Sequence, residues 1–199
     1  MMYWKKSISD IVAAFVVQML FFVPAYAGNV ESGITVDRGG DFTLNSADGP
    51  LSLNELRGKV VLLFFGYTSC RDVCPIALST IDRVFANMTP DELGRVQALF
   101  ISLDPERDTL EKLKKYTGYF HPNIVGVTEK PEVVAEVAEQ YGVRYKKKIL
   151  PNSALGYVDH HPADIFVVGP DGKLRNTLAH NVHARPLINR IRSLLSAER

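Results

Sequence analysis

The residues with the clearest capacity for chemistry are Cys70 and Cys74, the only two cysteines in a chain of 199 residues. They lie in the stretch Gly66–Pro75, which reads GYTSCRDVCP and follows a strongly apolar run. In a continuous helix, residues four apart lie on one face with about 6 Å of rise between them. That separation accommodates a disulfide, and it also lets two sulfurs converge on one soft metal ion. The spacing alone therefore leaves three interpretations: a structural disulfide, a redox pair or a metal site.

A structural disulfide is the weakest of these interpretations. A loop closed over so few residues restricts the unfolded chain little, so the bond would add little stability. A chain of this length with 46% hydrophobic residues also buries a core without covalent help. The expected position of Cys74 near a helix start favours thiolate, because helix N-termini carry partial positive charge and unpaired N–H groups. Thiolate is the form that both metal binding and disulfide exchange require.

Strands and helices alternate along the chain and predict an α/β fold around a central mixed sheet flanked by helices. The apolar run Lys59–Phe65 predicts a strand buried on both faces, and the helical period after it predicts a helix from Cys74 to about Met88. The other expected elements are a short hairpin or edge element within 41–56, a strand at Val96–Leu103, a helix from Asp104 to about Phe120, a strand at Ile124–Val127, a helix at Pro131–Tyr141, a hairpin excursion at 142–160, strands at Ile165–Val168 and Leu174–Leu178, and a helix at Ala184–Ala197.

A metal site needs a third ligand beside the cysteines, and the chain contains five histidines. His160 and His161 directly precede a predicted core strand, at the sheet edge where the loop with Cys70 should also lie. Two thiolates and an imidazole suit copper, because sulfur selects Cu(I) and a nitrogen donor also allows Cu(II). Loop polarity, helix capping or solvation explains the other three, which are His121, His180 and His183.

Charged residues near the cysteines have structural explanations as well as functional ones. Asp72, between the two cysteines, could orient a ligand from outside the coordination shell of the metal, or could simply form the turn. The charged residues of 104–108 are interpreted as helix capping and compensation of the helix dipole, without a further function.

The N-terminal residues have the layout of a secretory signal. Lys5 and Lys6 precede the apolar run Ile11–Val23, and Ala25–Ala27 has the small-residue pattern of a cleavage site. The run is shorter than the roughly 20 residues that span a bilayer, although an uncleaved anchor is the alternative. We therefore expect a signal peptide or N-terminal anchor at 1–27, a linker at 28–41 and a single domain at 42–199. The domain would be exported to a bacterial periplasm, soluble or tethered by its N-terminus.

The charge balance argues against one class of partner. Lys and Arg together number 23 and Asp and Glu 22, so the chain has no strong overall field to attract nucleic acid or anionic lipid. We therefore expect no nucleic-acid partner.

Several motifs, in order along the chain, resemble the Sco/SenC family of copper chaperones. They are GYTSCRDVCP, SLDPERDT at Ser102–Thr109, GVTEKPEVVAEVAEQYGVRY at Gly126–Tyr145, and a histidine followed by GPDGK at Gly169–Lys173. The resemblance covers residues 40–196. It implies a thioredoxin-like fold and one copper ion per chain, Cu(I) or Cu(II), held by Cys70, Cys74 and one histidine.

The same resemblance offers two candidates for the histidine ligand. The Asp-His dipeptide usual in the family points to His160, whereas the usual spacing to the Gly-Pro turn points to His161. A slip of one residue moves a strand side chain to the opposite face, so the two cannot serve equally. We favour His161, because the distance from strand to turn is the firmer measure.

The function that the resemblance implies is delivery of copper to the CuA site of cytochrome c oxidase, or preparation of the thiols of that site. The partners would be subunit II of the oxidase or another copper-site apoprotein, together with a copper donor or a thiol reductant. The alternative function is a periplasmic thiol-disulfide oxidoreductase acting through Cys70 and Cys74, which needs no histidine.

Overall fold

The structure is a computed structural model that describes residues 38–149, 157–160 and 163–197, with only the backbone described at 147–149 and 157–160. All of these residues belong to one compact unit, Asp37–Arg199. The expected signal peptide at 1–27, most of the expected linker at 28–41, and His161 lie outside the described residues.

A seven-stranded mixed sheet forms the centre of the unit, with the strand order β2-β1-β5-β4-β3-β8-β9. The three central strands β3, β4 and β5 are parallel, whereas β8 runs antiparallel to β3 and β1 antiparallel to β5. The strands are β1 (Thr43–Ser46), β2 (Gly49–Ser52), β3 (Val60–Gly66), β4 (Val96–Ser102), β5 (Ile124–Thr128), β8 (Asp164–Val168) and β9 (Leu174–Ala179). A separate two-stranded sheet pairs β6 (Lys146–Ile149) with β7 (Tyr157–His160).

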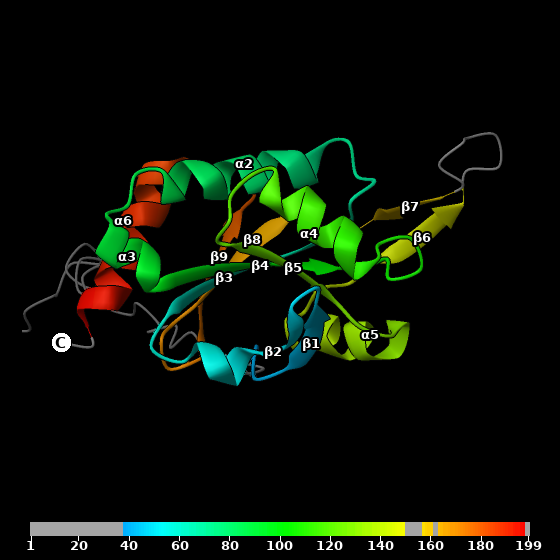
Figure 1. Ribbon diagram of the computed structural model, residues 1–199, viewed down its shortest axis with the longest axis horizontal. Coiled ribbons are helices and arrows are strands. Elements are labelled where there is room, and N and C mark those ends of the chain that lie inside the picture. The colour runs from blue at the N-terminus through cyan, green and yellow to red at the C-terminus, as the bar shows by residue number, and fades with distance from the viewer. Residues whose placement is uncertain (1–37, 150–156, 161–162, 198–199) are drawn as a thin grey trace, which may run out of the picture. The chain divides into compact units, whose positions relative to one another are not determined.

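Helices cover both faces of the sheet (Figure 1). On one face lie α2, α3, α4 and α6, and on the other lie α5 and a short 3-10 helix, η1. Their bounds are η1 (Leu53–Leu56), α2 (Val73–Phe85), α3 (Pro90–Gly94), α4 (Leu110–Gly118), α5 (Pro131–Gln140) and α6 (Ala184–Ser196). The predicted α/β architecture, with its hairpin before the last two strands of the sheet, is therefore confirmed.

The apolar run of β3 explains why this strand lies at the centre. Every residue of β3 is buried. Leu62 and Phe64 enter the core beneath α2 and α6, while Leu63 and Phe65 enter the core on the face of α5. Side chains alternate between the faces of a strand, so a strand covered on both sides must be apolar at every position.

The strand register gathers three segments at one edge of the sheet. Gly66 at the end of β3 pairs with Ser102 at the end of β4, so the loops that follow these strands leave the same edge. The antiparallel pairing of Phe64 with Ile165 brings the start of β8 to that edge as well. The loop with the cysteines, the loop after β4 and the start of β8 therefore meet there.

The structure differs from the expected elements at two places. The helix expected from Asp104 begins only at Leu110, where the side chain of Thr109 accepts a hydrogen bond from the N–H of Lys112. Residues 103–109 form a loop, because Asp104 and Asp108 turn their side chains into the interior instead of capping a helix. The short helix α3 was not expected; it has a capping box in which Thr89 and Glu92 bond to each other's backbone N–H.

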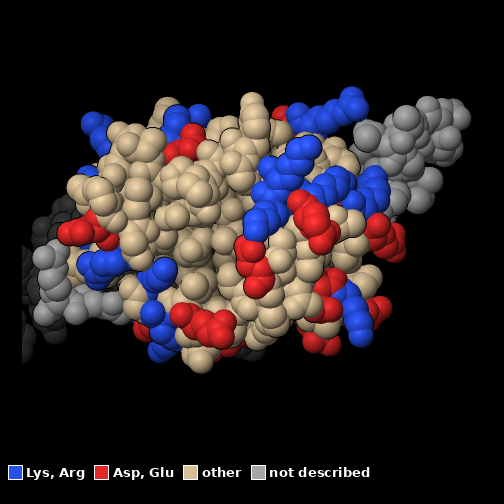
Figure 2. All heavy atoms as spheres, viewed as in Figure 1, with Lys and Arg blue, Asp and Glu red and all other residues tan. Residues whose placement is uncertain are grey.

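The surface carries both signs of charge. In Figure 2, Lys and Arg side chains gather near α4, with Asp and Glu side chains beside them. Lys114 of α4 lies 2.5 Å from the carboxylate of Asp48, and Lys112 lies 3.0 Å from that of Asp108. Pairing of this kind agrees with the near-neutral composition.

Candidate metal centre

The two cysteines lie on either side of the start of α2, at the sheet edge where β3 ends. Cys70 is half-buried in the loop after β3, and its N–H donates to the carbonyl of Tyr67 at 3.2 Å in a tight turn. Cys74 is the second residue of α2 and is 0% exposed. Both are present as thiols, and a hydrogen bond joins their side chains. The two sulfurs therefore meet, although Cys70 lies in the turn before α2 and not on one continuous helix with Cys74.

Gly66 gives Cys74 the room that it occupies. A Cβ atom at Gly66 would lie 2.7 Å from Sγ of Cys74 and 3.0 Å from Cε2 of Phe100. Real Cβ atoms do not approach other heavy atoms so closely, so a larger residue would displace the thiol. The glycine that ends β3 is thus part of the construction of the site.

The metal-free site keeps Cys74 protonated. The hydrogen bond to Cys70 raises the pKa of the Cys74 thiol, and burial raises it further, as does the negative charge of Cys70 whenever Cys70 is ionised. A backbone hydrogen bond from Tyr67 lowers the pKa. The expectation that the helix N-terminus would favour thiolate at this position is therefore wrong for the metal-free protein. A second sulfur within hydrogen-bond reach and loss of hydration outweigh the partial charge of the helix.

The carboxylate of Asp108 holds the loop before Cys70 in place. Helix capping was the role expected for this residue. Asp108, which is buried, accepts hydrogen bonds from the N–H of Thr68 at 2.9 Å and from its hydroxyl at 2.5 Å. The hydroxyl of Ser102 and Nζ of Lys112 donate to the same carboxylate at 2.7 and 3.0 Å. The role could have been predicted from a parallel pairing of β3 and β4, because such a pairing places the loops that follow the two strands side by side.

A second buried acid borders the same loop. Asp104 is 0% exposed and forms an ion pair with Arg107, whose guanidinium lies 5.9 Å from the ring centre of Tyr67. The loop after β4 thus contacts the cysteine loop through Tyr67 as well as through Thr68. Two neighbouring contacts of this kind fix the backbone that carries Cys70.

Asp72, the expected residue beside the ligands, is exposed and precedes α2 at the N-cap position. Its side chain makes no capping hydrogen bond to that helix. An acid at this position still contributes favourably to the field at the helix start.

His160 and His161 are the expected third ligands. The backbone of His160 ends β7, where it pairs with Lys146, and His161 lies outside the described residues. Asp164, the first residue of β8, lies near the end of β3, at the edge of the sheet where the cysteine loop begins.

The remaining histidines have other environments. His121 accepts a hydrogen bond at Nδ1 from the N–H of Asn123 at 3.0 Å, and its ring packs on Phe85 with ring centres 4.9 Å apart. His183 is exposed at the N-cap position of α6, with no capping bond from its side chain. The N–H of His180 donates to the carbonyl of Ala163 at 2.9 Å.

Within the described residues, no group of three or more His, Cys, Asp or Glu side chains is arranged to hold a metal ion. The described part of the candidate site consists of the two sulfurs. A pair of thiols that already share one hydrogen bond is a fitting donor set for a soft ion, which would replace that shared proton.

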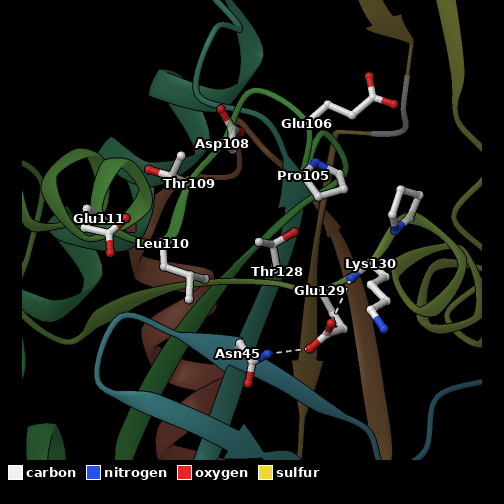
Figure 3. A pocket seen from close by; sticks show the side chains of 11 residues that line it. Asn45, Pro105, Glu106, Asp108, Thr109, Leu110, Glu111, Thr128, Glu129 and Lys130 are labelled. Carbon is white, nitrogen blue, oxygen red and sulfur yellow. Dashed lines mark hydrogen bonds between the residues drawn. The ribbon is translucent and has the colours of Figure 1, made fainter.

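A cavity of about 500 Å³ adjoins the candidate site across Asp108 (Figure 3). Asp108 lies at one rim of this cavity, and Asn45 and Glu129 lie at the opposite one, where Nδ2 of Asn45 donates to the Glu129 carboxylate at 2.5 Å. Its lining contains carboxylates, a lysine and prolines but neither cysteine. The cavity is thus separate from the pair of sulfurs.

Comparison with known proteins identifies the family. The family described as SCO1/SenC matches residues 31–196. The chain belongs to the SCO1/SenC family. It is 31% identical over 166 residues to the mitochondrial protein SCO2 of Saccharomyces cerevisiae, an alignment that covers 82% of this chain and 54% of the yeast protein. The chain thus spans about half the length of that relative.

Solved structures of the SCO1/SenC family share the fold. Apo Sco1 of Thermus thermophilus is 36% identical, with a TM-score of 0.72 and coverage of 79% of this chain and 91% of that one. The copper-bound structure of Bradyrhizobium japonicum ScoI is 34% identical, with a TM-score of 0.72 and coverage of 79% and 99%. The expected thioredoxin-like fold is therefore confirmed.

No helix in the described part of the chain is both long and apolar enough to cross a membrane.

Proposed function

We propose that this protein is a copper chaperone that binds one copper ion per chain through Cys70, Cys74 and His161, with His160 as the alternative third ligand. Copper is its cargo, which it delivers to the CuA site of cytochrome c oxidase. The observation that carries the proposal is the hydrogen-bonded pair of thiols at the sheet edge from which β8 departs. Family membership and the copper-bound relative from Bradyrhizobium japonicum support it.

The chemistry of this site follows from its donors. Binding of Cu(I) would release the protons of both thiols, because thiolate is the metal ligand. The raised pKa of Cys74 makes this release costly in the metal-free state, so copper must compete with protons for that sulfur. Cys74 would hold the ion from the buried side and Cys70 from the half-buried loop, so the ion would lie near the surface.

The proposed receiving partner is subunit II of cytochrome c oxidase or another copper-site apoprotein. We further propose that the domain acts after export, with 1–27 as a signal peptide or anchor and 28–41 as a linker. Periplasmic action agrees with the resemblance to a secretory signal at the N-terminus.

An anaerobic titration of the reduced protein with Cu(I), against a competing chelator, tests the proposal. We expect one Cu(I) per chain in the wild type and loss of this stoichiometric site in Cys70→Ser and Cys74→Ser. Cu(I) affinity should fall in His161→Ala more than in His160→Ala. His183→Ala is the matched control, since His183 is exposed and bonds to no backbone group of α6.

The outcomes separate the two functions. Absence of stoichiometric copper binding would contradict the chaperone. If replacement of both His160 and His161 left the copper affinity intact, the histidine would have no role. Thiol-disulfide exchange with an apoprotein in that case would indicate an oxidoreductase. Transfer of copper to a soluble domain of the oxidase subunit, followed by the spectrum of the receiving site, tests the partner.

A further inference from the structure

One phenol that packs against the core cluster of Cys74 has a buried hydroxyl without a hydrogen-bond partner among the described residues. The hydroxyl of Tyr116, on α4, is inaccessible to solvent and forms no hydrogen bond within the described part of the chain. The ring itself is well held: its centre lies 5.5 Å from that of Phe100 and 5.5 Å from that of Phe120. The hydroxyl is therefore fixed in place by its ring and not by a polar contact.

Such an arrangement requires an explanation. A buried hydroxyl without a partner loses its hydrogen bonds to water and gains nothing in return, and few such groups occur in native proteins. A phenylalanine would fill the same space without this loss. A state of the protein in which the hydroxyl gains a partner would account for its presence.

The surroundings of the hydroxyl point to the candidate metal centre. Tyr116 and Cys70 pack against the same core cluster, which contains Cys74 and Phe100. The Phe100 ring and Sγ of Cys74 both border the space above Gly66. Side chains on a helix lean toward its N-terminus, and α4 starts at Leu110, two residues after Asp108, which holds the cysteine loop.

The electrostatics agree with this placement. Burial raises the pKa of Tyr116, and the neighbouring Cys74, Cys70 and Asp108 raise it further, in that order. The phenol therefore keeps its proton at neutral pH and acts as a donor. In the metal-free site the two thiols share a hydrogen bond with each other, whereas metal-bound thiolates have lost both protons and accept hydrogen bonds from other donors.

We propose that Tyr116 is a positioning residue of the metal centre, whose hydroxyl donates a hydrogen bond to a cysteine thiolate when copper is bound. This inference rests on the proposed function. A hydrogen bond to a coordinating sulfur fixes that ligand and withdraws electron density from it, which stabilises Cu(I) relative to Cu(II). Tyr116 keeps its proton throughout, and the protons displaced by copper come from the thiols.

The variant Tyr116→Phe tests the inference, because it removes the hydroxyl and keeps the ring. We expect Cu(I) affinity to fall about tenfold, as for loss of a hydrogen bond to a charged group. The sulfur-to-copper charge-transfer bands of the Cu(II) form should shift, and the reduction potential of the bound copper should fall. The melting temperature of the metal-free protein should stay the same or rise, because an unpaired buried group has been removed.

Tyr119→Phe is the matched control, at the residue that caps the C-terminus of the same helix. Tyr119 is 86% exposed, so the loss of its hydroxyl should change none of these quantities. If Tyr116→Phe raised the melting temperature but left copper affinity, spectrum and potential unchanged, Tyr116 would be an unpaired core residue and the inference would be wrong. Normal copper binding by the wild type in that experiment would leave the proposed function intact. If the wild type bound no copper, both proposals would be wrong.

Discussion

The carboxylate of Asp108 accepts two hydrogen bonds from Thr68, 40 positions earlier in the chain: one from its N–H at 2.9 Å and one from its hydroxyl at 2.5 Å. We expect Asp108→Asn to weaken this link, because the amide replaces one acceptor oxygen with a donor. The free energy of unfolding should fall by about 2 kcal/mol, as for a buried group left unsatisfied. Cu(I) affinity should fall as well, because the loop carries Cys70. Urea unfolding and chelator competition measure the two effects.

Two further variants make this prediction specific. Thr68→Val removes the hydroxyl but keeps the N–H, so its effects should be smaller than those of Asp108→Asn. Asp171→Asn removes a surface partner of Arg175, with both side chains 40% exposed, and should change stability by less than about 0.5 kcal/mol. Equal stability and copper affinity in Asp108→Asn and Asp171→Asn would show that the buried link does not hold the loop.

Replacement of Gly66 by alanine should disturb the sulfur of Cys74 directly. The new Cβ would meet Sγ of Cys74 at 2.7 Å and the Phe100 ring at 3.0 Å. Overpacking of this kind costs about 1–3 kcal/mol, and a displaced thiol should also lower Cu(I) affinity. Gly118→Ala is the control: nothing lies within 4 Å of its Cβ position at the end of α4, so it should leave copper binding unchanged. Wild-type copper affinity in Gly66→Ala would argue against a tightly built pocket.

The two thiols should differ in reactivity toward an alkylating agent. Cys70 is half-buried, whereas Cys74 is fully buried and has a raised pKa, so little of its thiolate exists near neutral pH. We expect iodoacetamide to label Cys70 first in the folded, reduced protein, and labelling of Cys74 to accelerate as the pH rises. Peptide mapping by mass spectrometry at timed intervals gives the two rates. The difference should disappear in denaturant, and equal rates in the folded protein would contradict the burial of Cys74.

Acid should weaken the link between α3 and α6. The pKa of Glu92 is lowered from 4.5 to about 2, first by its hydrogen bond with Arg192 and then by the N–H of Thr89. As the pH falls, Glu92 therefore takes up a proton in the unfolded state before it does so in the folded state. The stabilisation is complete above about pH 4.5 and is lost as the pH falls toward 2.

Removal of either partner should flatten this dependence. In Glu92→Gln and Arg192→Gln, the free energy of unfolding should fall less steeply between pH 4.5 and 2 than in the wild type. Chemical unfolding at a series of pH values measures the slope. Wild-type slopes in both variants would show that another group governs acid stability in this range.

A strand of the sheet could be predicted where its burial on both faces follows from one continuous stretch of sequence. The apolar run Lys59–Phe65 predicts a strand buried on both faces, and β3 occupies nearly the same residues. The helix expected at Asp104 was misplaced, because acids followed by a helical pattern normally cap a helix. Here Asp104 pairs with Arg107 within the same loop and Asp108 accepts a hydrogen bond from the distant Thr68, so neither acid caps a helix.

The site was predictable only in part for a related reason. The spacing of Cys70 and Cys74 is a local signal, and the two sulfurs do meet, through the turn that precedes α2. The contributions of Gly66, Asp108 and Tyr116 depend on which loops and helices meet in space. The sequence alone does not show whether a glycine that ends a strand also leaves space for a sulfur atom.

Under the proposed function, the unequal depth of the two sulfurs would give copper release an order. Among the described residues, Cys74 is enclosed by the core whereas Cys70 is half-buried, so an incoming ligand would approach an ion held between the two sulfurs from the side of Cys70. The bond to the outer sulfur would therefore exchange first, while the inner sulfur still retains the ion. Under the proposed function, the cargo would pass from sulfur to sulfur in steps and would never be free in water.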